Sequence, residues 1–372
     1  MGSSVQRIIV VSAVNVRKGG TLTIQRDCLQ YLSELSKSGL YRVYALVHKR
    51  DLYGFEGIEY IEFPDTIKSW GRRLWCEYVT MRKISKTIAP VYLWLSMHDT
   101  TPNVIAEKRA VYCQTSFPFY KWNFRDIFFD YKIVLFALFT RFAYRINIHK
   151  NDYLIAQQQW FEKSWSELLR FDPSRIILCP PQRKQQGVVP ETIDADTPLF
   201  FYASTPDCHK NFQLVCEAAR ILEKRIGRKR FNVVITLSGD KNRYDRWLYR
   251  KWGNVASLQF SGFLSKERLY GYYQVASCLI FPSKVETWGL PISEYMDVSV
   301  KPMILADLPY AHETAVGDNP VAFVDPNNPV QLADIMEDVI NGRLDVFSLP
   351  QAQPTAGLIA YSWADLFEIL LK

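Results

Sequence analysis

The sequence has no run of apolar residues long enough to cross a bilayer, for which a helix needs about 20 of them. The longest candidate, residues 133–139, is soon followed by Arg141. The apolar run in the N-terminal stretch MGSSVQRIIVVS is too short for a signal peptide. We therefore expect a protein that is not integral to a membrane.

Cysteine is sparse, and its spacing suggests no cross-link or metal site. The chain has seven Cys and no CxxC pair. An odd number of Cys without a signal peptide is typical of a reducing compartment, so we predict a cytoplasmic location. Cys208 and His209 form the only cluster that could attract a metal, and two adjacent residues do not make a tetrahedral site. The sequence therefore predicts no metal.

Two common nucleotide-binding motifs are also missing. No GxGxxG follows Ala13 or Ser204, where strands are expected to end, which argues against a nicotinamide dehydrogenase. No GxxxxGK[ST] occurs either, which argues against a P-loop ATPase.

What the chain does contain is typical of a globular protein. Its 372 residues are 48% hydrophobic and 22% charged, and this length favours two domains. The net charge of +7 divides into +11 for residues 1–190 and −4 for residues 191–372. A basic first half suggests an anionic partner, for which nucleic acid, a membrane surface or a lipid phosphate would serve.

In the first half, strand-like and helix-like patterns alternate. Residues 7–13 form a continuous β-branched run of the kind that is buried on both faces of a parallel sheet. Thr21 can cap a helix that extends to about residue 35, and residues 70–88 have a second helical pattern. Further strands are expected at residues 41–47, 57–63, 91–95, 110–113 and 153–156. This alternation predicts a doubly wound parallel sheet.

A second alternating series follows residues 179–198, a stretch rich in Pro, Gln and charge that we interpret as a linker. The expected strands are residues 199–204, 232–237, 258–260, 278–281 and 302–306. The expected helices are residues 211–225, 266–275, 330–340, 361–371 and one that begins near Pro291. We therefore predict an α/β protein with two Rossmann-like domains that face a cleft. The first would contain residues 1–180 and the C-terminal helix 358–372, and the second residues 190–357.

The stretch PSKVETWGLPISEYM, residues 282–296, places two carboxylates around a Gly-Pro loop. It follows a predicted buried strand, and open α/β sheets bind ligands at the carboxyl ends of their strands. Gly289 lets the backbone approach an anion at the free amides of Gly289 and Leu290. Glu286 and Glu294 suit the vicinal hydroxyls of a sugar or a ribose. Alternatively, Glu286 is merely solvated and Glu294 favours the helix dipole.

Other strand ends carry further candidate residues. Lys210, at the entrance of a helix, can neutralise a phosphate, or it is an exposed lysine beside a helix cap. His98 can act as a general base or contact reacting groups, or it has a structural role. Gly19 and Gly20, in the first loop, allow a close approach to a phosphate or form a tight turn.

Together these residues resemble glycosyltransferase family 4, whose retaining enzymes have the GT-B fold. The segment ETWGLPISE, with Glu286 and Glu294 at its ends, resembles the family's pair of glutamates around a Gly-Leu-Pro loop. Lys210 in the sequence HKNF resembles the family's phosphate lysine. The resemblance covers nearly the whole chain and is strongest over residues 199–330.

The first half contributes to the same resemblance. Gly19 and Gly20 match the family's first-loop glycines, and His98 matches the histidine of its N-terminal domain. Two positions depart from the family's pattern. Residues 204–206 are Ser, Thr and Pro, whereas the family often has an Arg a few residues before the lysine. Gln114 stands where related sequences often have a His.

The resemblance implies a role for each of these residues. Glu294 would bind the ribose hydroxyls, and Lys210 with the amides of Gly289 and Leu290 would hold the diphosphate as a leaving group. The implied catalytic residues are His98 and Glu286. The implied donor-binding residues are Gly19, Gly20, Lys210, Glu286, Thr287, Gly289, Leu290 and Glu294. No metal is implied, because the lysine and helix N-termini would replace it.

The implied partners are a GDP- or UDP-linked sugar donor, with no separate cofactor, and a glycan or polyprenyl-diphosphate-linked acceptor. The implied setting is the biosynthesis of a surface polysaccharide at the inner face of the cytoplasmic membrane, and no nucleic acid takes part. The segment 121–150 alternates Phe and Ile with Arg and Lys. It either lies on an anionic membrane surface or forms a core helix with a basic outer face.

Two other functions remain open at this stage. A sugar-nucleotide epimerase of similar two-domain build would act on a donor without a glycan acceptor. A non-catalytic binding protein could keep the fold without the reaction, although Glu286, Glu294, Lys210 and His98 argue against it.

Overall fold

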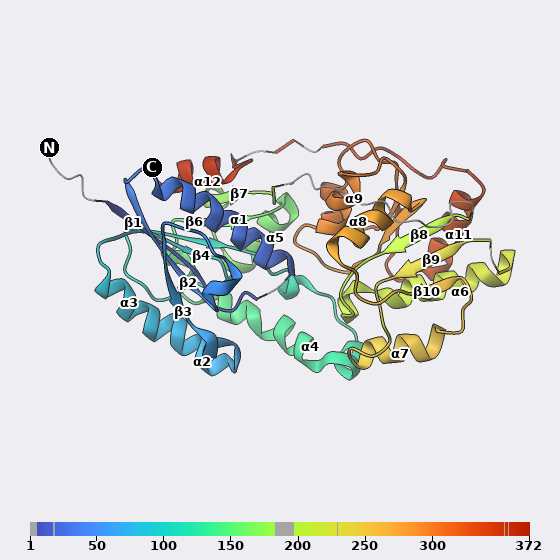
Figure 1. Ribbon diagram of the computed structural model, residues 1–372, viewed down its shortest axis with the longest axis horizontal. Coiled ribbons are helices and arrows are strands. Elements are labelled where there is room, and N and C mark those ends of the chain that lie inside the picture. Colours follow the sequence, from blue (N-terminus) through green and yellow to red (C-terminus); the bar gives the residue numbers. More distant parts are fainter. Residues whose placement is uncertain (1–5, 18, 183–196, 229, 353, 356) are drawn as a thin grey trace. The chain divides into compact units, whose positions relative to one another are not determined.

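The computed structural model describes residues 6–17, 19–182, 197–228, 230–352, 354–355 and 357–372 (Figure 1). They fall into two compact units. Unit 1 contains Met1–Thr115, Phe139–Gln182 and Thr355–Lys372, and unit 2 contains Ser116–Leu138 and Arg183–Pro354. Most of the predicted linker, residues 183–196, lies outside the described residues.

Unit 1 is built on a sheet of eight strands in which all the strand pairs are parallel. From one edge to the other its strands are β14 (Leu358–Ile359), β7 (Ile176–Leu178), β6 (Tyr153–Ala156), β5 (Lys108–Tyr112), β4 (Val91–Ser96), β1 (Arg7–Ala13), β2 (Tyr41–Val47) and β3 (Ile58–Glu62). Five consecutive residues of β1 are buried, because helices cover both faces of a doubly wound sheet.

The helices of unit 1 are α1 (Gly19–Ser36), α2 (Trp70–Trp75), α3 (Met81–Thr87), α5 (Gln159–Leu169) and α12 (Trp363–Leu370). A π-helical turn, Cys76–Thr80, joins α2 to α3. The sequence therefore predicted the helical region 70–88 correctly but not its irregular centre. The helix α12 packs into the core of this unit through Leu366, Phe367 and Leu370.

Unit 2 has a parallel sheet of six strands. In spatial order they are β10 (Leu258–Phe260), β9 (Asn232–Ile235), β8 (Leu199–Tyr202), β11 (Cys278–Phe281), β12 (Met303–Ala306) and β13 (Val321–Val324). The helices are α6 (Phe212–Ile226), α7 (Arg243–Trp252), α8 (Lys266–Val275), α9 (Leu290–Met296), α10 (Pro309–Thr314) and α11 (Pro329–Ile340). The prediction of two doubly wound parallel sheets is confirmed.

Both sheets reverse their strand order at one point. In unit 1 the connections run outward in opposite directions from β1 and β4, and in unit 2 from β8 and β11. The loops at the carboxyl ends of two such strands diverge and leave a crevice, which is where open α/β sheets bind ligands. The topology therefore selects the loops after β1 and β4, and those after β8 and β11.

The long helix α4 (Phe124–Arg145) begins in unit 2 and ends in unit 1. Its backbone leaves the helical region at Asp130 (φ −151°, ψ 84°). The outer side of α4 carries exposed apolar residues as well as cations. The exposed apolar side chains are Phe124, Ile127, Phe128, Tyr131, Leu135, Phe139 and Phe142. The outer face is therefore not the purely basic one that a core helix was expected to have.

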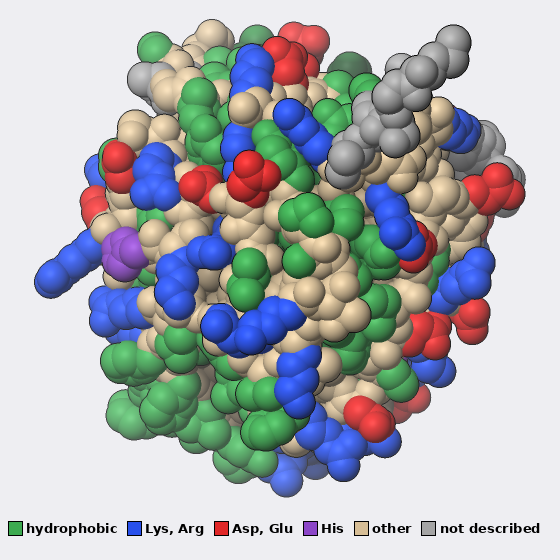
Figure 2. All heavy atoms as spheres, turned by 90° about the vertical axis from the view of Figure 1, so that its left-hand side faces the viewer, with side chains coloured by type: hydrophobic (Ala, Val, Ile, Leu, Met, Phe, Trp, Pro, Cys, Tyr) green, Lys and Arg blue, Asp and Glu red, His purple; other side chains and the backbone are tan. Residues whose placement is uncertain are grey.

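Figure 2 shows the side of the molecule that lies on the left in Figure 1, where the elements of unit 1 are found. Lys and Arg side chains are spread over this face, and hydrophobic side chains gather in its lower part. Within the part of the chain that the structure describes, no helix is both long and apolar enough to span a membrane.

The burial of α12 can be tested by Phe367→Ala. The Phe367 ring is fully buried and stacks on Tyr31, with 5.4 Å between ring centroids. We expect a loss of about 3 to 5 kcal/mol of unit 1 stability, the usual cost of removing a buried aromatic ring. Hydrogen exchange of unit 1 peptides followed by mass spectrometry measures it. The exposed neighbour Glu368 provides the control, since Glu368→Ala should leave exchange unchanged.

Candidate active site

In unit 2, the loops that follow β8 and β11 are fastened to each other. The backbone carbonyl of His209 accepts a hydrogen bond from the Lys284 N–H at 2.8 Å and another from the Ser283 hydroxyl at 3.3 Å. His209 is buried, so its carbonyl needs such partners in place of water. The two loops therefore form one surface at the point where the strand order reverses.

Asn211 secures the start of α6 in the same region. Its backbone is left-handed (φ 59°), a conformation that Asn tolerates better than most residues. The side-chain amide donates to the carbonyl of Pro282 at 3.2 Å and to that of Pro326 at 2.7 Å. The Tyr202 hydroxyl, at the end of β8, donates to the Lys210 carbonyl at 2.5 Å. These bonds orient the backbone of Lys210 before any ligand is present.

Lys210 and Glu286 meet across the two loops. The Lys210 Nζ lies 2.5 Å from the Glu286 Oε1, and both side chains are mostly buried. The chain separates these residues by 76 positions. The sequence analysis assigned both to the donor site from separate motifs, and the structure brings them into direct contact.

Glu294 lies on α9 and faces α8 rather than Lys210. Partial burial raises the pKa of Glu294 to about 7, although the positive charge of Lys266 and the neighbouring Tyr273 hydroxyl lower it. Near neutral pH the carboxyl group is therefore divided between its two protonation states. Such a group can both accept and donate hydrogen bonds to hydroxyls.

The loop between the two glutamates has a left-handed glycine at its end. Gly289 (φ 92°) precedes α9, and a side chain there would lie 3.2 Å from Ile292 and 3.5 Å from Tyr310. Thr287 and Leu290 flank this part of the loop and are half-buried. The Trp288 indole N–H donates to the Ser293 hydroxyl at 3.1 Å, so Trp288 braces the loop against the first turns of α9.

In unit 1, the loops after β1, β4 and β5 enclose a cavity of about 160 Å³. Its lining includes Asn15, Arg17, His98, Asp99 and Gln114. Gly19 and Gly20 are the first two residues of α1 and do not lie in the loop before it. The helix therefore begins two residues before the predicted cap at Thr21. Gly19 has φ 74° and open space around its α-carbon.

His98 lines this cavity and is only 2% exposed. Its Nε2 lies 3.1 Å from the Ser12 hydroxyl oxygen, which accepts from the Trp94 indole at 3.1 Å. Its Nδ1 lies 2.8 Å from the Thr100 hydroxyl oxygen, which donates to Glu77 at 2.6 Å. These directions assign the ring proton to Nδ1 and make Nε2 the acceptor.

Burial lowers the pKa of His98 to about 4, against the raising effect of Glu77. The ring is therefore neutral at pH 7. Glu77 itself is fully buried and pairs with Arg73 at 2.7 Å. Burial raises the pKa of Glu77, but the charge and hydrogen bond of Arg73 and the hydrogen bond from Thr100 help to keep it below its ordinary value. Glu77 belongs to the π-helical turn, and no local sequence signal pointed to it.

Asp99, which follows His98 after the end of β4, is a second acid of this site. It is left-handed (φ 66°) and buried, and it accepts bonds from the backbone N–H of Gln114 and from Thr115. Burial raises the pKa of Asp99. A strained, buried acid that ties two strand-end loops together is a feature typical of functional sites.

The predicted residues thus form two groups. Gly19, Gly20 and His98 belong to the strand ends of unit 1, and the other predicted residues to those of unit 2. The roles that the resemblance implies for them stay predictions. Among the described residues, no group of three or more His, Cys, Asp or Glu is placed to hold a metal ion.

The raised pKa of Glu294 predicts a pH-dependent stability. The carboxyl group holds its proton more tightly in the folded chain than in the unfolded chain, whose pKa is near the ordinary 4.5. Its stabilising contribution is therefore complete below about pH 4.5 and is lost as the pH rises through 7. Glu294→Gln cannot ionise. We expect its stability advantage over the natural chain to grow by about 2 to 3 kcal/mol from pH 5 to pH 8.

Urea unfolding of both proteins at several pH values measures this difference. The exposed Glu368→Gln serves as the control, and its curve should run parallel to that of the natural chain. A parallel curve for Glu294→Gln as well would show that burial does not raise the pKa of Glu294.

Comparisons with known proteins agree with this geometry. Residues 185–352 match the family model described as "Glycosyl transferases group 1", somewhat less than half of the chain. The matched region contains Lys210, Glu286 and Glu294. No curated protein matches the sequence.

Several solved structures share the fold over most of the chain. A sucrose-phosphate synthase from Thermosynechococcus elongatus superposes with a TM-score of 0.65 at 13% identity, covering 90% of each chain. The lipopolysaccharide outer core galactosyltransferase WaaB has a TM-score of 0.61 at 12% identity, covering 91% of this chain and 92% of WaaB. HepE from Anabaena, in complex with UDP-glucose, has a TM-score of 0.59 at 11% identity, covering 90% of each chain.

At these identities the neighbours establish the fold alone, and that fold is GT-B, as the sequence analysis expected. The family match adds a chemical class to it. Residues 185–352 match the model for glycosyl transferases group 1 within a chain of the GT-B fold, which supports a glycosyltransferase enzyme.

Proposed function

We propose that the protein transfers a sugar from a nucleotide-diphospho-sugar to a glycan or a lipid-linked glycan. The observation that carries this proposal is the contact between Lys210 and Glu286 where unit 2 reverses its strand order. The two joined loops hold one cation beside one carboxylate. This pair matches the diphosphate and the sugar of such a donor. A diphosphate needs the cation, and sugar hydroxyls need the carboxylate.

The donor would lie along the loops after β8 and β11. Lys210 and the free amides of Gly289 and Leu290 would hold the diphosphate, and the left-handed Gly289 lets the backbone come close to it. Glu286, with Thr287 beside it, would accept hydroxyls of the transferred sugar. Glu294 would accept the ribose hydroxyls. A GDP- or UDP-linked sugar satisfies this order, and the fold neighbour HepE contains UDP-glucose.

In the reaction, the bond between the sugar C1 and the diphosphate oxygen breaks, and the diphosphate keeps the electron pair. The acceptor hydroxyl forms the new bond to C1 and passes its proton to the departing diphosphate oxygen. Lys210 and the amides stabilise the charge that develops on the leaving group. The resemblance to glycosyltransferase family 4 supports retention of the anomeric configuration, which an NMR spectrum of the product determines.

Unit 1 would receive the acceptor near the cavity around His98. The neutral ring of His98, fixed by Thr100 and Ser12, would offer the acceptor a polar wall without adding a charge. Gly19 and Gly20 would let the start of α1 approach a phosphate. Asp99 and Gln114 line the same cavity and extend its polar surface.

The proposed acceptor is carried by a lipid diphosphate at the inner face of the cytoplasmic membrane. WaaB, a fold neighbour, is a lipopolysaccharide galactosyltransferase. The exposed aromatic residues of α4 lie among cations, which is the composition of a helix that rests on an anionic bilayer. The protein would then be a peripheral enzyme of polysaccharide synthesis.

A panel of nucleotide-sugars tests the proposal. A donor that binds the folded chain raises its melting temperature by mass action, so thermal shift identifies both base and sugar. Products are then analysed with the donor alone and with a lipid-linked glycan added. Conversion of the donor without any acceptor would indicate an epimerase and would contradict the proposed transfer.

Lys210→Ala should lower the transfer rate by roughly 100- to 1,000-fold, the usual effect of removing one group that stabilises the charge of a transition state. The effect should fall mainly on kcat, because the charge on the leaving oxygen develops as the bond breaks. Steady-state kinetics with the best donor measure it. The exposed Lys241, in the same unit, gives a control, and Lys241→Ala should keep the natural rate.

The affinity for the donor should rise with pH. Glu294 has a pKa of about 7 and accepts hydroxyls best when ionised. Between pH 6 and pH 8 we expect the affinity for the donor to increase by about tenfold, because one carboxyl group becomes ionised over this range. Calorimetric titrations measure it. Glu294→Gln should bind more weakly and with no pH dependence. A flat profile in the natural chain would remove Glu294 from the donor site.

A further inference from the structure

The second unit has a basic surface that its net charge conceals. Helix α7 has the sequence RYDRWLYRKW, and Asp245 is its only acid. Asp245 is fully buried and accepts the backbone N–H groups of Gly239 and Lys241. The exposed ionic side chains of α7 are therefore all cations: Arg243, Arg246, Arg250 and Lys251.

The first turns of α4 continue this surface. Phe129 packs on α7, with ring centroids 5.3 Å from Tyr244 and 4.9 Å from Trp247. Figure 1 shows the start of α4 beside α7. Phe124 and Phe128 point outward and are 86% and 70% exposed. All of these residues belong to unit 2.

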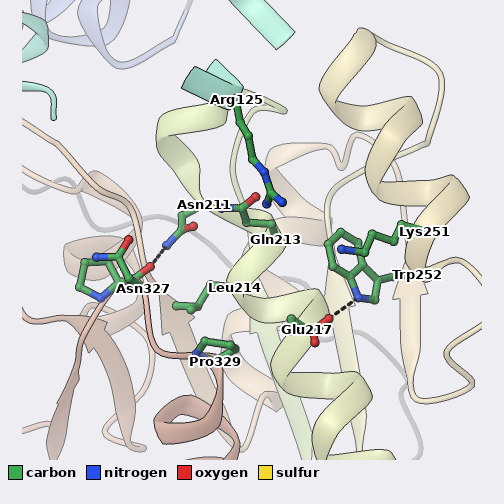
Figure 3. A pocket seen from close by; sticks show the side chains of 10 residues that line it. Arg125, Asn211, Gln213, Leu214, Glu217, Lys251, Trp252, Asn327 and Pro329 are labelled. Carbon is green, nitrogen blue, oxygen red and sulfur yellow. Dashed lines mark hydrogen bonds between the residues drawn. The ribbon is translucent and has the colours of Figure 1, made fainter. Parts of the chain in front are cut away.

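A cavity of about 190 Å³ opens between the two helices and α6. Arg125 of α4 and Lys251 of α7 both line it, together with the amide side chains of Gln213 and Asn327 (Figure 3). In Figure 3, Arg125 reaches towards Gln213, and Lys251 lies along Trp252. The Lys251 Nζ is 4.3 Å from the centroid of the nearer Trp252 ring.

The two cations of this cavity are not held in ion pairs with the acid beside them. Glu217, the acid in the lining, already accepts the Trp252 indole at 2.9 Å and the guanidinium of Arg220. No ion pair joins Arg125 or Lys251 to a carboxylate of the described residues. The hydrogen bond from Arg220 lowers the pKa of Glu217 most, and the charge of Lys251 adds to this, so Glu217 offsets part of that charge. Two cations with nearby amide donors still suit a phosphate group.

We propose that α7 and the first turns of α4 form a docking surface for an anionic phospholipid bilayer, with the cavity of Arg125 and Lys251 receiving a lipid phosphate. The occupant is a bilayer because the cations adjoin two large exposed aromatic rings. Cations and aromatic side chains together bind the headgroup region of an anionic membrane, where the rings enter the interface and the cations meet phosphates.

This inference deepens the proposed function and rests on it for its purpose, since a lipid-linked acceptor needs the enzyme at the membrane. It extends the membrane surface that the sequence suggested for residues 121–150 to α7. The charge distribution pointed to residues 1–190, whereas α7 lies in the half with a net charge of −4. The nucleotide-binding unit would thus contact the membrane through its own helix.

Co-sedimentation of the full chain with vesicles tests the proposal. The vesicles contain phosphatidylcholine alone or equal parts of phosphatidylcholine and phosphatidylglycerol. We expect binding to the anionic vesicles at low salt, and weaker binding when salt is added. Arg246→Ser with Arg250→Ser should lower the affinity by roughly 30-fold, the effect of two charges at the surface. Phe124→Ser with Phe128→Ser should lower it by roughly tenfold.

A matched control removes two exposed cations near the C-terminal end of α6, by Lys224→Ser with Arg228→Ser. This control should bind vesicles as the natural chain does. The proposal is overturned if the α7 variant binds as tightly as the control, or if the natural chain does not bind anionic vesicles. It is also overturned if Arg125→Ser with Lys251→Ser abolishes the binding of inorganic phosphate without weakening the binding to anionic vesicles, because the cavity would then be a site for free phosphate alone.

Arg125→Ser with Lys251→Ser examines the cavity itself and should weaken binding to anionic vesicles without changing that to phosphatidylcholine. Donor binding in solution, measured by calorimetry without vesicles, separates this proposal from the proposed function. It should be the same in all of these variants and the natural chain. A variant that loses vesicle binding but keeps donor binding has lost the docking surface alone. If the natural chain does not transfer sugar to a soluble glycan, the result contradicts the proposed function and not the docking surface.

Discussion

The site of unit 2 depends on the parallel pairing of β8 with β11. At this pair the chain connections run outward in opposite directions. The loop that follows β8 therefore lies beside the loop that follows β11. The loops contain buried carbonyl groups that water cannot reach. The His209 carbonyl finds its donors in the other loop, and the contact between Lys210 and Glu286 then follows from this fastening.

In unit 1, the segments that follow β1 and β4 are also joined at the strand-order reversal, here by hydrogen bonds between side chains. Ser12 at the end of β1 and His98 after β4 are 86 positions apart and lie 3.1 Å from each other. The chain of hydrogen bonds continues through Thr100 to Glu77, whose charge is balanced by Arg73. The Glu77 carboxylate also lies 3.4 Å from the His98 Nδ1, so the histidine ring is placed beside a charge that Arg73 balances. The strand-order reversals of the two units thus carry different polar groups.

Patterns in the sequence predicted most strands of both sheets, since buried parallel strands are local signals, but they did not predict the short strands β7, β13 and β14. Helix α7 was not predicted because its sequence is strongly polar, although Asn242 caps its start and Gly253 follows its end. Glu77 was not predicted because its position depends on a π-helical turn and on partners distant in sequence. The packing of Phe129 on α7, which joins residues 116–138 to unit 2, likewise depends on distant partners.

The pairing of Lys210 with Glu286 also determines what a ligand must supply. Both charges have lost much of their hydration, and each compensates the other, so a ligand that engages only one of them leaves the second uncompensated. A bare diphosphate would attract Lys210 but would place its own negative charge beside Glu286. A diphosphate that carries a sugar offers negative oxygens to the lysine and hydroxyl donors to the carboxylate. In the proposed function, the ion pair therefore favours an intact donor over a diphosphate without a sugar, because only the intact donor compensates both partners.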